Sequence, residues 1–203
     1  MSEEFQLVAG HLALDFANTL DNRYDPARLQ ELLPTYDRFL AFAKQSRAIT
    51  GQQAHKLLAE TSARDAKKVL HRVIDLRETL YFLFRAAATG QRPDQSRLRT
   101  LNRFLADIRV PDIIVWRRPD FIRGCRDLAE RPDGPLWPVI EAAANLLTSP
   151  DRRRVRECGD KACRWLFLDR SKNHSRRWCN MQVCGNRSKA RRFQLRLRHS
   201  GAA

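Results

Sequence analysis

The spacing of four cysteines constrains this sequence more than any other feature. Cys158 and Cys163 form one C-x4-C pair, Cys179 and Cys184 form a second, and fifteen residues separate the two pairs. The opening residues, MSEEFQLVAG, show no basic segment followed by an apolar one, so we expect an unsecreted chain with reduced thiols. Closely spaced cysteine pairs then indicate a metal site, and four thiolates complete the tetrahedral coordination of zinc. We therefore predict one structural Zn²⁺ bound by these four cysteines.

Positive charge is concentrated in the same part of the chain. The 203 residues include 38 Lys+Arg and 23 Asp+Glu, which gives a formal net charge of +15. Residues 151–203 hold 16 of the basic residues and only 4 acidic ones, an excess of 12 in about a quarter of the chain. This asymmetry indicates a polyanionic partner for the C-terminal part. We expect two domains, 1–150 and 151–203, with the boundary at Ser149-Pro150.

The composition argues against a membrane protein. Charged residues make up 30% of the chain, and no apolar run approaches the roughly 18 residues that a spanning helix needs. We expect a cytoplasmic protein with no membrane partner.

Residues 1–150 are dominated by helical periodicity. Thr50 with Gln53 has the pattern of a capping box, and Gly90 followed by Pro93 is a typical helix end. Apolar residues at helical spacing predict helices over 12–20, 35–44, 51–61, 66–88, 94–107 and 138–148.

A small β element is predicted within this helical part. Residues 113–116, Ile-Ile-Val-Trp, are mostly β-branched and lie between two prolines, as expected for a strand. Its partner is predicted near 121–125 or near the N-terminus. The expected fold class is mainly α (α+β): a helical N-terminal domain with a small β element, followed by a treble-clef-like zinc finger with four cysteine ligands.

The zinc-binding part has its own predicted order of elements. A strand over 164–168 follows the first cysteine pair, a polar turn follows it, and a helix over 186–198 follows the second pair. Ala190, Phe193 and Leu197 share one face of this helix, and we expect that face to pack on the zinc-bound hairpin.

Two stretches resemble known families. FLDRSKNHSRRWCNMQVCGNRSKARR, within residues 155–193, resembles the CGNR-type zinc finger, which is named for the residues here numbered Cys184 to Arg187. LVAGHLALDFANTLDNR, residues 7–23, resembles the start of the ABATE domain that usually precedes this finger. The resemblance implies a bacterial, stress-linked transcription regulator with a treble-clef-like finger that binds DNA.

Two sets of candidate binding residues follow. Basic side chains around the second cysteine pair are predicted to contact phosphates or bases, since a guanidinium suits both. Asn186 belongs to this set, although an asparagine at a helix start is more often a cap than a base-reading residue. The nucleic-acid set is Arg176, Arg177, Asn186, Arg187, Lys189, Arg191, Arg192 and Arg196.

A second set of polar residues lies among apolar ones near the N-terminus and suggests a small-molecule pocket. The alternative is that these side chains cap a helix or form internal hydrogen bonds. That set is His11, Asp15, Asn18, Thr19 and Arg23.

The leading functional hypothesis is a transcription regulator that binds double-stranded DNA. Its N-terminal domain would sense a small-molecule effector or stress signal, or form a homodimer. The alternatives are association with RNA or the ribosome, and a protein-interaction finger. We do not expect an enzyme, because His174 is the one histidine between the cysteine pairs and four thiolates leave zinc no open position.

Overall fold

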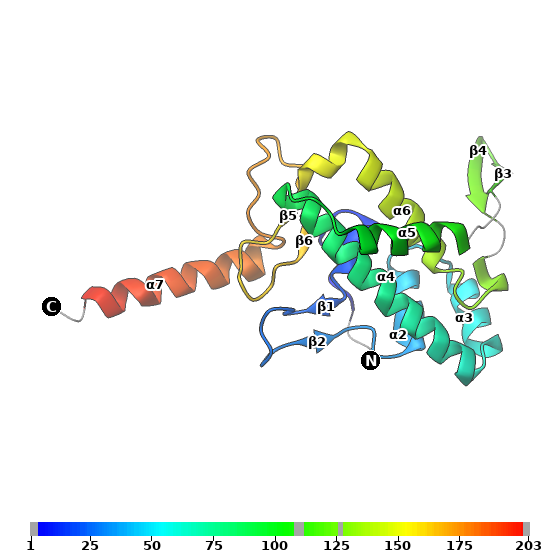
Figure 1. Ribbon diagram of the computed structural model, residues 1–203, viewed down its shortest axis with the longest axis horizontal. Helices are drawn as coiled ribbons and strands as arrows, with labels where there is room; N and C mark the ends of the chain where they lie inside the picture. The colour runs from blue at the N-terminus through cyan, green and yellow to red at the C-terminus, as the bar shows by residue number, and fades with distance from the viewer. Residues whose placement is uncertain (1–3, 108–111, 126–127, 201–203) are drawn as a thin grey trace.

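The computed structural model describes residues 4–107, 112–125 and 128–200, with the backbone alone for 112–113, 117, 122–125 and 195–200 (Figure 1). Six α-helices form the N-terminal part, and each corresponds to a predicted helix. They are α1 (Leu12–Ala17), α2 (Tyr36–Gln45), α3 (Gly51–Glu60), α4 (Ala63–Thr89), α5 (Gln95–Asp107) and α6 (Leu136–Thr148).

Local sequence signals set the ends of these helices. The predicted capping box is present at α3, where Thr50 and Gln53 each accept the backbone N–H of the other. The Ser62 hydroxyl caps α4, and Gly90 ends that helix with a φ of 67°, a left-handed conformation that glycine adopts without strain.

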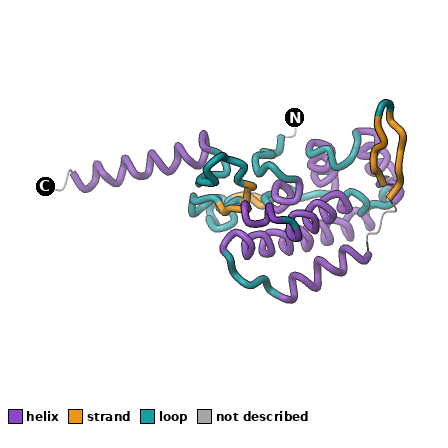
Figure 2. Tube along the Cα trace, turned by 90° about the horizontal axis from the view of Figure 1, so that it is seen from above, coloured by secondary structure: helices purple, strands orange, loops and turns teal. Residues whose placement is uncertain are grey.

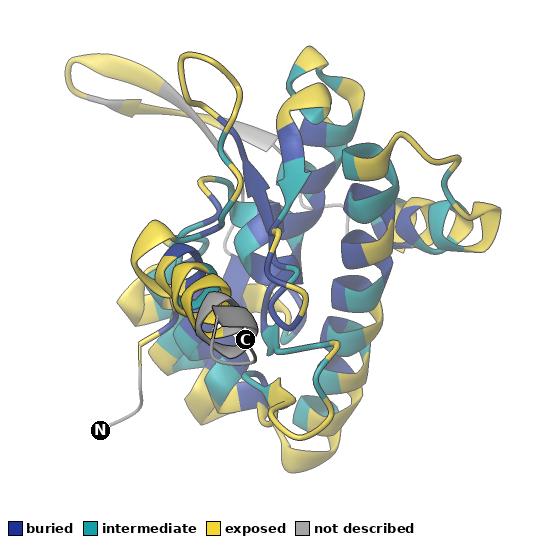
Figure 3. Ribbon diagram, turned by 90° about the vertical axis from the view of Figure 1, so that its left-hand side faces the viewer, coloured by how far each residue is buried: buried dark blue, intermediate teal, exposed yellow. Residues whose placement is uncertain are grey.

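The 27-residue helix α4 is the centre of the fold (Figure 1). It packs against α1, α2, α5 and α6 and against the strands of the zinc-binding part. Val73, Leu76, Leu80 and Phe84 recur at helical spacing along its buried face and are fully enclosed. In Figure 3 the buried residues gather where the helices face one another.

Three antiparallel two-stranded pairs complete the described β structure. Residues 113–116 were predicted as a strand with a partner near 121–125 or near the N-terminus. The structure has the first of these pairings, with Trp116 opposite Phe121. The pairs are β1 (Leu20–Asp21) with β2 (Gln30–Glu31), β3 (Asp112–Arg117) with β4 (Asp120–Cys125), and β5 (Val155–Glu157) with β6 (Leu166–Leu168). The fold is therefore mainly α with small β elements, as predicted.

Short turns connect the helices to the zinc-binding part. A 3-10 turn, η1 (Leu128–Glu130), precedes α6, and a second, η2 (Pro150–Arg154), leads from α6 into β5. After β6, a loop leads to a π-helical turn, η3 (Met181–Gly185), and then to the helix α7 (Asn186–Ser200). No helix in the described parts of the chain combines the length and apolarity needed to cross a membrane.

The zinc-binding hairpin is built into the helical core. One cluster of buried apolar side chains extends from Phe5 through α4 to Phe167 and the four cysteines. Three hydrogen bonds join the outer edge of β6 to the N-terminal segment. The Asn18 side chain donates to the Leu166 carbonyl at 2.8 Å and accepts the Leu166 N–H at 2.9 Å, and the Leu168 N–H donates to the Ala9 carbonyl at 2.8 Å. The Asn18 side chain thus satisfies the backbone N–H and carbonyl of Leu166, as a neighbouring strand would do.

The helix α7 extends away from the rest of the molecule (Figure 2). The prediction that Phe193 packs on the zinc-bound hairpin is wrong, since its side chain is 60% exposed and Ala190 is exposed as well. Figure 3 shows the described residues of this helix to be largely exposed. The apolar stripe is too short, and the basic side chains around it too numerous, to fold the helix back onto the body.

The contact between Asn18 and Leu166 gives a stability prediction. Asn18→Leu removes both polar partners and leaves a buried N–H and a buried carbonyl unsatisfied, so we expect a loss of about 2–4 kcal/mol in the free energy of unfolding. Urea denaturation of the zinc-loaded protein measures this loss. Asn102→Leu, the same change on the exposed face of α5, is the matched control and should cost less than about 0.5 kcal/mol. Equal losses in the two variants would contradict the account.

Candidate metal centre and nucleic-acid interface

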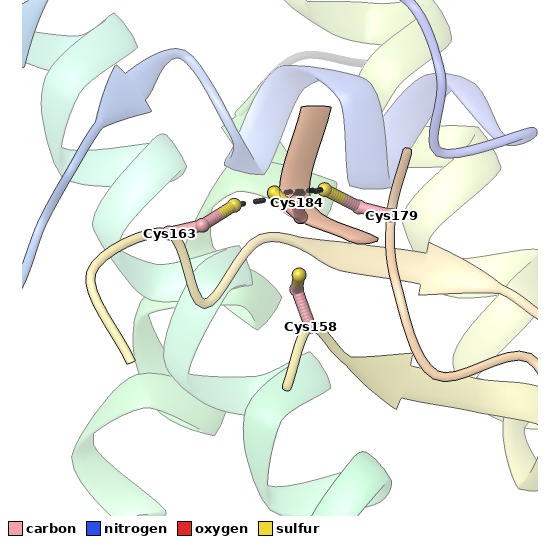
Figure 4. Close-up of side chains that lie close together, drawn as sticks. All are labelled: Cys158, Cys163, Cys179 and Cys184. Atoms are coloured by element: carbon pink, nitrogen blue, oxygen red, sulfur yellow. Dashed lines mark hydrogen bonds between the residues drawn. The ribbon is translucent and has the colours of Figure 1, made fainter. Parts of the chain in front are cut away.

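The four predicted cysteine ligands converge on one point (Figure 4). Their sulfur atoms all lie within 4.8 Å of one another, and all four residues are buried. The Cys163 and Cys179 sulfurs are 3.6 Å apart, and those of Cys179 and Cys184 are 3.7 Å apart. A tetrahedron with Zn–S bonds of about 2.3 Å has edges of about 3.8 Å. The donor type, the number of sulfurs and their separations therefore fit one structural Zn²⁺.

Backbone hydrogen bonds place each ligand. Cys158 follows β5, and its N–H donates to the Trp165 carbonyl at 2.8 Å, which closes the turn that carries Cys163. On the other side, Cys184 lies in η3, and its N–H donates to the Asn180 carbonyl at 2.9 Å. A zinc knuckle within a hairpin, followed by a helical turn that supplies the last ligand, is the treble-clef arrangement that the sequence predicted.

The electrostatics of the cage favour a bound cation. Hydrogen bonding to the Cys158 sulfur, reinforced by burial, raises the pKa of the thiols of Cys163 and Cys179 above the ordinary cysteine value. Four sulfurs this close cannot all ionise unless a cation lies between them. Bound zinc supplies that charge, and its role here is to hold the four chain segments together.

Asp160, which sequence reasoning missed, connects the first cysteine pair to α7. Its side chain is only 1% exposed and accepts hydrogen bonds from Arg187 at 3.3 Å, Arg191 at 3.2 Å and the Ala162 N–H at 3.1 Å. Two of the predicted nucleic-acid residues are therefore paired with this carboxylate, which fixes the first two turns of α7 against the zinc knuckle. The one available signal was that Asp160 is the only acidic residue between Cys158 and Cys163.

Arg176 also has an internal role. Its guanidinium donates to the carbonyls of Trp178 and Cys179 and lies 4.5 Å from the centre of the Phe167 ring. These contacts hold the loop that carries Cys179 against β6. Since its N–H groups are used on backbone carbonyls, Arg176 stabilises the metal centre from within the protein.

The remaining predicted nucleic-acid residues differ from these three. Lys189 and Arg192 lie exposed on α7, and Arg177 is exposed beside the Trp178 ring, 5.2 Å from its centre. Asn186 is exposed and lies where η3 leads directly into α7. The Asn180 side chain caps the start of η3, where it accepts the Gln182 N–H at 2.9 Å. The Arg196 side chain lies outside the described residues.

The five polar residues predicted as a ligand pocket lie on and beside α1, and their side chains bond to the protein itself. His11 caps α1 by accepting the Ala13 N–H at 3.3 Å, and burial keeps its pKa below the usual value, so it stays neutral and able to accept. Thr19 donates to the Phe16 carbonyl at 2.8 Å, and Asn18 pairs with β6 as described.

Arg23 and Asp15 complete this set. Arg23 forms a two-pronged ion pair with Glu78 and lies 4.0 Å above the centre of the Tyr81 ring. The Tyr81 hydroxyl in turn donates to the Arg164 carbonyl at 3.2 Å, next to Cys163.

Asp15 holds the N-terminal segment in place beside β6. Its carboxylate accepts the Ala9 N–H at 2.9 Å, and the Ala9 carbonyl accepts the Leu168 N–H. The structure thus brings these residues together around the junction with the zinc-binding hairpin.

A helical domain joined to a buried cage of four cysteines with a projecting basic helix defines a zinc-finger protein of the treble-clef class. Comparison with known families agrees with this assignment. Residues 10–150 match the ABATE family model, described as "Putative stress-induced transcription regulator", and residues 154–197 match the CGNR zinc finger. The chain therefore belongs to the ABATE family and carries a CGNR zinc finger. No curated protein matches it.

The environment of Asp15 predicts a specific pH dependence of stability. Burial raises the pKa of its carboxyl to about 6, against the opposing hydrogen bonds from the Ala9 and His11 backbones. In the folded protein the carboxyl keeps its proton to a higher pH than in the unfolded chain, so its contribution to stability is lost as the pH rises through about 6. Asp15→Asn keeps the oxygen that accepts from Ala9 and removes the charge.

We expect the free energy of unfolding of the wild type to fall relative to Asp15→Asn by about 1.4 kcal/mol between pH 5 and pH 7.5. Urea denaturation of both zinc-loaded proteins at the two pH values measures the difference. Parallel pH profiles would show that the Asp15 carboxyl titrates normally.

Proposed function

We propose that this protein binds double-stranded DNA through its zinc-binding part and regulates transcription. The observation that carries the proposal is the projection of α7 from a base fixed by the metal cage and by Asp160. A projecting helix with cationic side chains has the size and charge to lie against a DNA groove. The family assignment and the excess of basic residues in 151–203 support the same conclusion.

The proposed contacts are the exposed cations of this region. Lys189, Arg192 and Arg177 form no ion pair with a carboxylate in the described parts of the chain, so their charge is available to phosphates. Arg187 and Arg191 share the Asp160 carboxylate, and their proposed role is to set the angle of α7. A guanidinium held by one carboxylate keeps free N–H groups, so these two can still add contacts at the helix start.

The helical N-terminal domain is proposed to respond to an effector or stress signal. Its hydrogen bonds to β6 from Asn18 and Ala9 provide a physical connection to the finger. Because one small module gives limited affinity for DNA, we propose that two copies bind together. The zinc is proposed to be structural rather than catalytic, since four buried thiolates leave it no position for a substrate.

A salt titration tests the proposal. Fluorescence anisotropy with a labelled duplex of about 30 base pairs, long enough for two copies, measures affinity over a range of KCl concentrations. We expect the wild-type affinity to fall steeply with salt, and Lys189→Gln/Arg192→Gln to reduce the slope of log K against log salt by about 1.8 per copy bound, the value for two phosphate contacts. Arg64→Gln/Lys67→Gln removes the same charge from the exposed start of α4 and should leave the slope unchanged.

Three results would overturn the proposal. The first is the absence of salt-dependent binding, and the second is an equal slope for wild type and Lys189→Gln/Arg192→Gln. The third is preferential competition by a structured RNA hairpin at equal salt, which would assign the same surface to RNA.

A further inference from the structure

One cavity in the described structure lies away from both sets of predicted site residues. It has a volume of about 500 Å³ and opens between the C-terminal ends of α4 and α6, the start of α5, and η2. Its lining is mainly apolar and includes Leu83, Ala87, Leu98 and Leu147. A concave apolar surface of this volume is typical of sites that bind small organic molecules.

Two arginines line one side of this cavity. Arg152 and Arg153 belong to η2, and neither forms an ion pair with a carboxylate among the residues that the structure describes. Arg152 donates one N–H to the Ser149 carbonyl at 3.0 Å, which leaves most of its donors unused.

The nearby carboxylates are engaged elsewhere. Asp151 pairs with Arg154 at 3.5 Å, and Asp94 accepts the Ser96 N–H at 2.8 Å at the start of α5. An apolar cavity flanked by two unpaired guanidiniums is therefore complementary to a molecule with an apolar body and an anionic head.

We propose that this cavity is a binding site for an amphipathic organic anion, such as a medium-chain carboxylate. The apolar body occupies the space between α4, α5 and α6, and the carboxylate accepts hydrogen bonds from Arg152 and Arg153. The chain connects the site to the metal centre, because η2 continues directly into β5, and Cys158 follows that strand. A role of this ligand as the effector rests on the proposed function, whereas its binding does not.

Binding is tested on the full-length zinc-loaded protein without DNA. Isothermal titration calorimetry with octanoate and with 1-octanol separates the charged head from the apolar body. We expect the wild type to bind octanoate about tenfold more tightly than 1-octanol, and Arg152→Gln/Arg153→Gln to lose that preference. Ala87→Phe fills the cavity from a half-buried position and should weaken both ligands about tenfold.

Controls keep the result interpretable. Arg64→Gln/Lys67→Gln removes equal charge from the other end of α4 and should bind both ligands as the wild type does. Circular dichroism and zinc content confirm that each variant is folded. Failure of octanoate to bind at millimolar concentration, or unchanged binding in Ala87→Phe, would overturn the site. A change of oligomeric state in Ala87→Phe without a change in octanoate binding would assign the cavity to a second copy and would also overturn it.

Discussion

Coordination of one metal by four sulfurs is the interaction on which the C-terminal part of the fold depends. The strands β5 and β6 are three residues each, and a hairpin of that length is not stable alone in water. The loop from Asp169 to Trp178 has no helix or strand of its own. The cage brings ligands from the knuckle, from the end of that loop and from η3 to a common point. Its geometry sets where α7 begins and in which direction it leaves the body.

The helical domain supplies the hydrogen-bond partners for β6 that the metal does not provide. Zinc fixes the inner side of the hairpin, but the outer edge of β6 needs backbone partners, and Ala9 and Asn18 provide them. Asp15, by holding Ala9, and Tyr81, by donating to Arg164, support the same junction. The stretch that resembles the start of the ABATE domain therefore contributes directly to the finger. This arrangement gives α7 a large rigid base, and Asp160 extends the rigidity into the first turns of the helix.

The sequence predicted those features whose cause is local. Cysteine spacing identified the ligands, the Thr50–Gln53 pair identified a helix start, and Gly90 identified a helix end. The uses of polar side chains depend on which distant backbone they meet, and no local pattern encodes that. Asn18 meets a strand 148 residues further along the chain, and Arg176 turns inward although its neighbour Arg177 stays exposed. The packing expected for Phe193 was wrong because periodicity shows which residues share a face and not whether a partner surface exists.

Hydrogen exchange with and without metal tests the central claim most directly. The account predicts that backbone amides of β6 and η3 exchange slowly in the zinc-loaded protein, and that a zinc chelator abolishes this protection while α2 and α3 keep theirs. Because Asn18 and Ala9 pair with β6, protection at the start of α1 should fall as well. Unchanged protection of β6 and η3 after complete metal removal, verified by elemental analysis, would contradict the claim that the sulfur cage holds this part of the protein together.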